Sequence, residues 1–118
     1  MIIEFESEDR RADYQLFDSN PMTVGETVIT LTPGVVVAWN GTRAFKAANV
    51  PSVVEIGVEV AVGATGAVLA NAIWSWLSSK LKSPPKTISI DRIEVEFEEG
   101  AVKQLLMERI ERKESRDL

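Results

Sequence analysis

The 118-residue chain contains neither cysteine nor histidine. Without cysteine there is no disulfide framework, no thiolate nucleophile and no cysteine-ligated metal. Without histidine there is no imidazole base, no Ser-His-Asp triad and no histidine-ligated zinc or haem. Enzymes that use only Asp, Glu, Lys, Ser or Tyr remain, but no such residue stands in a spaced pattern with a base. We therefore predict a protein that is not an enzyme and that uses no cofactor and no metal.

Positive charge is also scarce, because 13 Lys and Arg residues face 18 Asp and Glu residues, which gives a net charge of −5. An acidic surface repels phosphate backbones, so we expect no nucleic-acid partner. The same charge makes basic protein partners plausible. The first residues carry acid where a secretory signal has Lys or Arg, and a chain without cysteine fits a reducing compartment. We expect a cytoplasmic protein.

The pattern of residues 1–46 is typical of an antiparallel β-meander. Ile3 and Phe5 alternate with glutamates, which indicates a half-buried strand. Further strands are predicted at 14–17, 26–32 and 35–39. Asn40-Gly41 is a strong hairpin signal, since both central residues of a type I′ turn need positive φ. We therefore expect a turn at Asn40-Gly41 and a return strand over 42–45.

The second half of the chain is predicted to be mainly helical. Ser52 and Glu55 form the pattern of a capping box, and Ser83-Pro84-Pro85 ends any helix, so a helix is predicted over 52–82. A strand region follows at 87–97, where Asp91-Arg92 marks a bulge or a tight turn because the apolar parity changes there. A C-terminal helix is predicted over 101–114. The whole chain, 1–118, is expected to form one α+β domain with an antiparallel meander packed against the long helix.

Residues 60–79 carry no charge and are rich in Gly, Ala, Ser and Thr. Three interpretations stay open. The segment is a helix buried in its own domain, or its small residues form a homo-oligomer interface, or residues 60–77 form a membrane span or a membrane-surface helix. We favour burial within the domain, because the later part of the helix is amphipathic. The interface candidates on this helix are Gly63, Ala67, Ala70, Trp74 and Trp76.

Acidic residues alternate along the predicted strand at 93–97 and continue just beyond it. Their functional interpretation is a docking surface for a basic partner, and the alternative is an ordinary solvent-facing strand surface. The candidates in this group are Glu94, Glu96 and Glu98.

One stretch resembles a known family. The order within residues 50–112 is a small-residue helix ending in Ala70-Asn71-Ala72-Ile73-Trp74-Ser75-Trp76-Leu77, a basic break with prolines, short strands over 88–97, and a terminal helix opening Ala101-Val102-Lys103-Gln104-Leu105-Leu106. This is similar to the effector-associated constant component family, small α+β domains that accompany effectors in bacterial conflict systems. The chain departs from that family in its longer N-terminal meander and in lacking an Asp-Gly hairpin turn after the helix. The resemblance implies an adaptor role without catalysis and transfers no functional residue.

The sequence therefore predicts a non-enzymatic protein–protein interaction or adaptor module of bacterial or phage origin. Its partner would be another protein, itself in a homo-oligomer, or both. The two alternatives are a small membrane-associated protein anchored by residues 60–77 and an acidic inhibitor of a basic nucleic-acid-binding enzyme.

Overall fold

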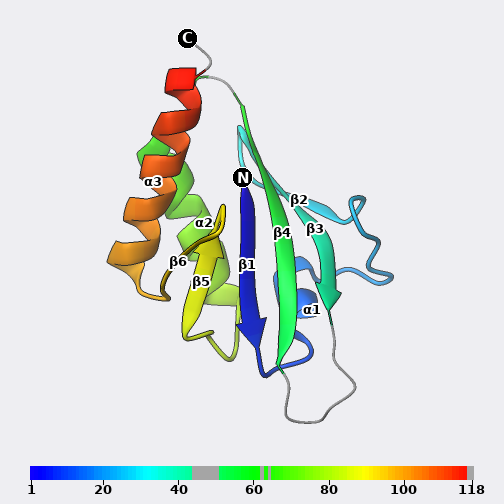
Figure 1. Ribbon diagram of the computed structural model, residues 1–118. Helices are drawn as coiled ribbons and strands as arrows, with labels where there is room; N and C mark the ends of the chain where they lie inside the picture. Colours follow the sequence, from blue (N-terminus) through cyan, green and yellow to red (C-terminus); the bar gives the residue numbers. More distant parts are fainter. Residues whose placement is uncertain (44–50, 62, 64, 117–118) are drawn as a thin grey trace.

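A computed structural model describes residues 1–43, 51–61, 63 and 65–116, and it shows an α+β fold built on one six-stranded antiparallel sheet (Figure 1). The strand order is β2-β3-β4-β1-β5-β6, so β2, β3 and β4 form a meander and β1 lies between β4 and β5. The predicted fold class is confirmed. The elements are β1 (Ile2–Ser7), α1 (Ala12–Phe17), β2 (Val28–Thr32), β3 (Val35–Arg43), β4 (Ser52–Val60), α2 (Gly66–Lys80), β5 (Thr87–Ile90), β6 (Ile93–Glu96) and α3 (Glu99–Arg116).

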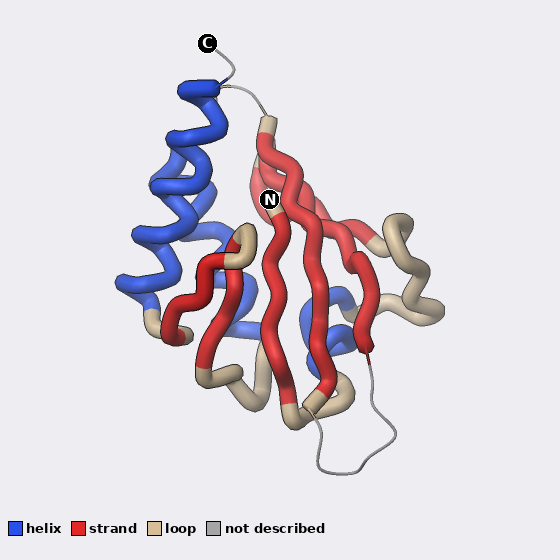
Figure 2. Tube along the Cα trace, viewed as in Figure 1, coloured by secondary structure: helices blue, strands red, loops and turns tan. Residues whose placement is uncertain are grey.

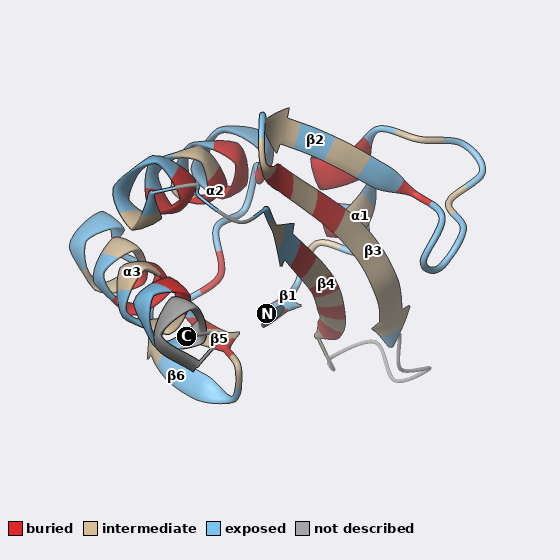
Figure 3. Ribbon diagram, turned by 90° about the horizontal axis from the view of Figure 1, so that it is seen from above, coloured by how far each residue is buried: buried red, intermediate tan, exposed pale blue. Residues whose placement is uncertain are grey.

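The helices cover one face of the sheet and leave the other face open (Figures 1 and 2). Side chains alternate along each strand, so every second residue points into the core. In β1, Ile3 and Phe5 are buried, and their register partners in β4 are Ile56 and Val54. The alternating bands of buried and partly buried residues are visible along β3 and β4 in Figure 3.

The apolar stripe of α2 is buried within the domain, as the favoured interpretation predicts. Leu69, Ile73 and Leu77 are all 0% exposed. Helix α3 packs against α2, and Gly66 lies at this contact, where an added Cβ atom would meet the backbone of Met107 at the ordinary contact distance of 3.9 Å. Within the described residues, no helix is both long enough and apolar enough to cross a bilayer.

The predicted helix over 52–82 is wrong in its first half. Residues Ser52–Val60 form β4, and the helix begins only at Gly66. Ser52 is 4% exposed and pairs with Ser7 of β1, so it is a strand residue and caps no helix. The physical reason is the period-2 pattern of β-branched side chains in this segment, which suits a pleated surface better than a helix.

The strand predicted at 14–17 is also wrong, because these residues belong to α1. Ala12, Leu16 and Phe17 are buried, and their spacing of four and five positions places them on one side of a short helix. Asp18 ends the helix in the left-handed conformation, with φ 46°. Asp91-Arg92, for which a bulge or a tight turn is predicted, forms the tight turn between β5 and β6, with φ of 48° and 71°.

The hairpin turn predicted at Asn40-Gly41 is a β-bulge inside β3. The register against β4 shifts between Trp39 and Gly41, and the strand continues to Arg43. Gly41 has φ +123°, a conformation that side chains with a Cβ rarely adopt. Gly41, which suggested a hairpin turn in the sequence, therefore permits a β-bulge in the structure. The rest of the predicted return strand, 44–45, lies outside the described residues.

Replacing Gly41 with alanine is expected to destabilise the fold by about 1–2 kcal/mol. A Cβ there would meet only Val24, at 3.8 Å, so the loss comes from the backbone conformation and not from a clash. Gly100→Ala is the matched control, because Gly100 lies in the first turn of α3, where an added Cβ would meet no atom of the described residues beyond its own helix within 4 Å. Urea titration should show that Gly100→Ala leaves stability unchanged or raises it slightly. Equal losses for both variants would contradict the special role of the bulge.

Candidate functional site

The open face of the sheet carries an acidic surface, which we call the acidic face. It is made by side chains that alternate with the core residues on β1, β4 and β6. On β1 and β4 these positions follow directly from the register, since Glu4 pairs with Glu55. The glutamates of the acidic face are Glu4, Glu6, Glu55, Glu59, Glu94 and Glu96.

Three of these glutamates lie in one row across the strands. Glu55 of β4 is opposite Glu4 of β1, Glu4 is opposite Ser89 of β5, and Ser89 is opposite Glu94 of β6. Neighbouring strands are about 4.8 Å apart, so Glu4 stands about 5 Å from Glu55 and about 10 Å from Glu94 at the level of the backbone. The short Ser89 side chain between them leaves the row open to a partner.

Little positive charge balances this row. Arg43 lies 3.7 Å from Glu4, but its side chain is 72% exposed, and such a surface pair contributes little. Thr87 donates a hydrogen bond of 2.9 Å to Glu94 without neutralising it. Like charges on directly opposite residues destabilise a sheet by roughly 0.2–1 kcal/mol. The Glu4–Glu55 pair therefore costs stability that folding alone does not require.

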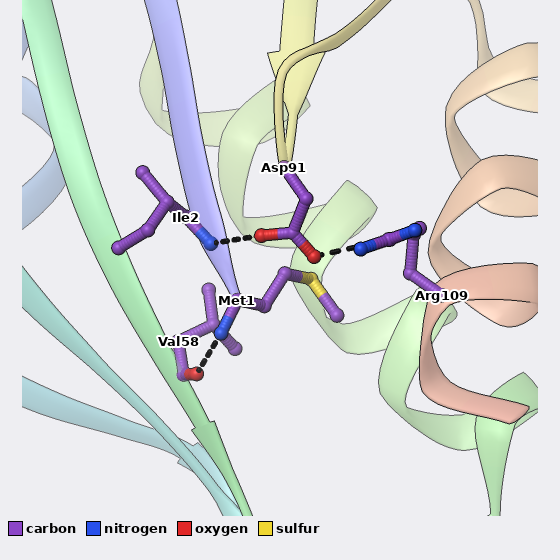
Figure 4. Close-up of polar contacts among 5 residues, drawn as sticks. All are labelled: Met1, Ile2, Val58, Asp91 and Arg109. Carbon is purple, nitrogen blue, oxygen red and sulfur yellow. Dashed lines mark hydrogen bonds and ion pairs between the residues drawn. The ribbon is translucent and has the colours of Figure 1, made fainter. Parts of the chain in front are cut away.

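A network at Asp91 fixes the upper margin of the acidic face (Figure 4). Its carboxylate accepts a hydrogen bond of 2.8 Å from the Ile2 amide and one of 3.1 Å from Nε of Arg109 on α3. The Asp91 amide in turn donates to the Ile2 carbonyl oxygen at 2.8 Å. Partial burial opposes ionisation, but the hydrogen bonds from Ile2 and Arg109 outweigh it and lower the pKa of Asp91 below its usual value.

A shallow hollow of about 700 Å³ lies between this network and the acidic row. Its lining consists of Ile2, Glu4, Glu55 and Ser89 from the strands, together with Asp91, Arg92 and Arg109. Arg109 is paired with Asp91, so the positive charge of Arg92 stands in the hollow beside the carboxylates of Glu4 and Glu55. The hollow therefore has mixed charge, and the excess of acid lies along the row of glutamates outside it.

The predicted site residues do not form one surface. Glu94 and Glu96 lie on the acidic face, and Glu98 follows β6 in an exposed position. Helix α2 lies on the other side of the sheet (Figure 1), where Ala67 is exposed on its first turn. Gly63 precedes α2 in a turn, with φ +93°. The helix candidates and the acidic strand therefore lie mainly on different sides of the sheet, and they approach each other where Trp74 packs on Phe97, just after β6.

Two of the helix candidates are corrected by their burial. Ala70 is 1% exposed and Trp76 is 6% exposed, so neither presents a surface to a partner. The Trp76 indole donates to the carbonyl oxygen of Leu16 at 3.1 Å and stacks edge-on against Phe17 at 5.3 Å. It therefore attaches α1 to α2. Trp74 is half-buried and packs on Phe97, with ring centroids 4.9 Å apart.

Sequence reasoning missed the glutamates of β1 and β4 as site residues. The signal was present in β4, where Glu55 and Glu59 alternate with Val54, Ile56 and Val58. The capping-box interpretation concealed this alternation, because in a helix the same residues would point in several directions and would not separate into two faces. The cross-strand partnership with Glu4 depends on a register between distant segments and has no local signal.

Within the described part of the chain, no group of three or more carboxylates is arranged to hold a metal ion. Comparison of the chain with protein-family models, with curated proteins and with solved structures finds no match in any of the three.

Proposed function

We propose that this chain is a non-enzymatic protein–protein interaction module that binds a basic partner protein through the acidic face. The observation that supports this most strongly is the row of Glu55, Glu4 and Glu94 across the open sheet. If the open face of the sheet carried serine, threonine or a mixture of charges in place of these glutamates, the chain would fold equally well. Such a face would also avoid the repulsion between Glu4 and Glu55. A basic partner converts that repulsion into attraction, because its cation is placed between two carboxylates.

The chemistry of the face defines the partner. Lysine or arginine side chains spaced by about 5 to 10 Å would match the row, as they do on one side of an extended or helical basic segment. Charge of this kind speeds association and selects partners more than it adds affinity. Binding should therefore weaken steeply with salt, since exposed charges are screened beyond about 8–10 Å at physiological ionic strength.

The absence of catalysis is argued from the lack of histidine and cysteine, and the bacterial or phage origin and the adaptor role are supported by the sequence resemblance of residues 50–112. In that proposal α2 and α3 form the scaffold, and the sheet provides the contact surface. The acidic inhibitor is a second candidate, because regularly spaced carboxylates on one open face can occupy the site of a phosphate backbone on a basic enzyme. The two differ in one respect: an inhibitor competes with nucleic acid for its target, whereas an adaptor does not need to.

A fluorescent deca-arginine peptide provides a defined basic probe for the acidic face. The triple variant E4Q/E55Q/E94Q removes the row, and each lost charge contact is expected to weaken binding by about 0.5–1 kcal/mol. The combined loss is about tenfold to a hundredfold in Kd at low salt. Fluorescence anisotropy at 20 and 200 mM NaCl measures the affinity.

The matched control is E8Q/E108Q/E111Q, which removes the same net charge from exposed residues outside the acidic face. It should retain affinity within about threefold of the wild-type chain. Equal losses in the two triple variants would mean that net charge alone attracts the peptide, and the proposed function would fail.

A further inference from the structure

A line of apolar residues crosses the open face of the sheet beside the acidic row. Gly57 of β4 has Ile2 of β1 on one side and Ala38 of β3 on the other. Ala38 is in turn opposite Val28 of β2. We call these four residues the apolar row. It lies one step along the strands from the row of glutamates, because Glu55 and Gly57 are successive residues of β4 on the open face.

The apolar row is accessible from the solvent. Its two ends are exposed, since Ile2 is 37% and Val28 is 53% exposed. Its middle is low, because Ala38 and Gly57 have small side chains or none. The Asn40 side chain borders this middle, where an added Cβ at Gly57 would meet its Nδ2 atom at 2.9 Å. The solvated face of an antiparallel sheet is usually polar, so the row is surface that a partner would gain by burying.

Carboxylates stand on both sides of the apolar row. On β4, Glu55 precedes Gly57 by two residues and Glu59 follows it by two, so all three lie on the open face. Four residues of a strand span about 13 Å, and an α-helix with its side chains is about 10–12 Å wide. One helix therefore fits between Glu55 and Glu59 with one side against the apolar row.

The length and the charge of the row also suit a helix. The row crosses four strands and is about 14 Å long, and apolar side chains at positions i, i+4 and i+7 of a helix span about 10 Å. The Ile2 end of the row lies in the hollow that also contains Arg92. The cations of a partner are therefore expected over Glu55 and Glu59, at the middle of the row.

We propose that the open face binds a basic amphipathic helix of a partner protein. The helix lies across the strands, with its apolar side chains on the apolar row and its lysine or arginine side chains over Glu55 and Glu59. This inference rests on the proposed function and specifies the form of the basic partner. Charge complementarity selects this occupant, because an acidic helix would place like charges against both glutamates. A basic segment without an apolar side would leave Ile2 and Val28 exposed.

Two matched peptides test whether the apolar row contributes to binding. Both have 14 residues, with lysine at positions 1, 3, 5, 7, 12 and 14 and alanine elsewhere, and one also carries leucine at positions 4, 8 and 11. The leucines form one stripe of a helix, and the lysines flank it on both sides. Fluorescence anisotropy at 50 mM NaCl should show that the wild-type chain binds the leucine peptide about tenfold more tightly than the alanine peptide. Alanine is the better helix former, so helicity does not explain such a preference.

The double variant Ile2→Thr/Val28→Thr removes the exposed apolar ends of the row and keeps β-branched side chains, which suit a strand. It should weaken binding of the leucine peptide by about tenfold and change the Kd of the alanine peptide by less than about twofold. Val68→Thr is the matched control, because Val68 is 54% exposed on α2, on the other side of the sheet. This control should bind both peptides like the wild-type chain.

Amide resonances give a second readout that does not depend on any variant. The leucine peptide, titrated into the ¹⁵N-labelled wild-type chain, should shift the resonances of Val28, Ala38 and Gly57. The alanine peptide should leave those of Val28 and Ala38 unchanged.

The outcomes separate this inference from the proposed function. Equal affinity of the wild-type chain for the two peptides would overturn the inference, and so would a loss of leucine-peptide binding in Val68→Thr equal to that in Ile2→Thr/Val28→Thr. The proposed function would stand in either case if E4Q/E55Q/E94Q still weakened the binding of deca-arginine. Deca-arginine binding that is independent of those glutamates would instead remove the proposed function, together with the inference that rests on it.

Discussion

Replacing Trp76 with alanine is expected to destabilise the fold by about 3–5 kcal/mol. The indole is 6% exposed, contacts Phe17 edge-on and donates to the Leu16 carbonyl oxygen. Its loss leaves a cavity, removes the aromatic pair and leaves a buried acceptor without its donor. Since a domain of this size has about 5–15 kcal/mol of stability in total, much of the variant should unfold at moderate urea concentrations.

Trp74→Ala is the natural control for this prediction, because Trp74 is two residues away on the same helix. Trp74 is half-buried, and its ring packs on Phe97. We expect a loss of about 1–2 kcal/mol for this variant. Urea denaturation followed by far-UV CD compares the two variants. A larger loss for Trp74→Ala would contradict the assignment of Trp76 to the core.

Replacing Asp91 with alanine is expected to destabilise the fold by about 2–3 kcal/mol, because two charge-assisted hydrogen bonds are lost and the Ile2 amide and Arg109 lose their acceptor. Alanine also tolerates the positive φ of 48° less well than aspartate does. Asp91→Asn keeps one acceptor oxygen and the tolerance of the left-handed conformation, so its loss should be about half as large. Thermal or urea unfolding at pH 7 measures both.

The contribution of Asp91 should depend on pH in a defined direction. Its pKa in the folded chain is below the ordinary value of 3.8. A lowered pKa gives stability that is fully present above the unfolded value and is lost as pH falls through the folded value. The stability difference between wild type and Asp91→Asn should therefore stay constant from pH 7 to about pH 5 and shrink below about pH 4. A difference that grows on acidification would contradict the network.

The sequence was sufficient where a local pattern and the final environment agree. The alternation of Ile3 and Phe5 with glutamates correctly predicted strand β1. The four-residue spacing of Leu69, Ile73 and Leu77 correctly predicted the buried side of α2. The parity change at Asp91-Arg92 located the irregularity that is the β5–β6 turn, although it left a bulge as the alternative. In each case side-chain burial reinforces the backbone preference of the segment.

The failures occurred where a short motif competed with a longer pattern. Ser52 and Glu55 matched a capping box, but the β-branched alternation over nine residues decided the outcome in favour of β4. Asn40-Gly41 matched a hairpin turn, but pairing with β4 on both sides kept β3 continuous through a bulge. A motif of two to four residues determines only a local backbone conformation. Pairing in the sheet determines whether the chain then reverses or continues as a strand.

Only part of the candidate site could be predicted. Glu94 and Glu96 were found because their alternation is local to one strand. Their combination with Glu4 and Glu55 requires the strand order β4-β1-β5-β6, which joins segments from both ends of the chain. The helix candidates Ala70 and Trp76 failed for the opposite reason. Small and aromatic residues at helical spacing suit a core and an interface equally well.

Mapping where a basic ligand binds tests most directly whether the acidic face receives a basic partner. Deca-arginine peptide titrated into the ¹⁵N-labelled chain should shift the amide resonances of Glu4, Glu55, Ser89 and Glu94, and leave those around Glu108 on α3 unchanged. Shifts that spread evenly over all exposed carboxylates, or that concentrate on α3, would contradict a specific role for the acidic face.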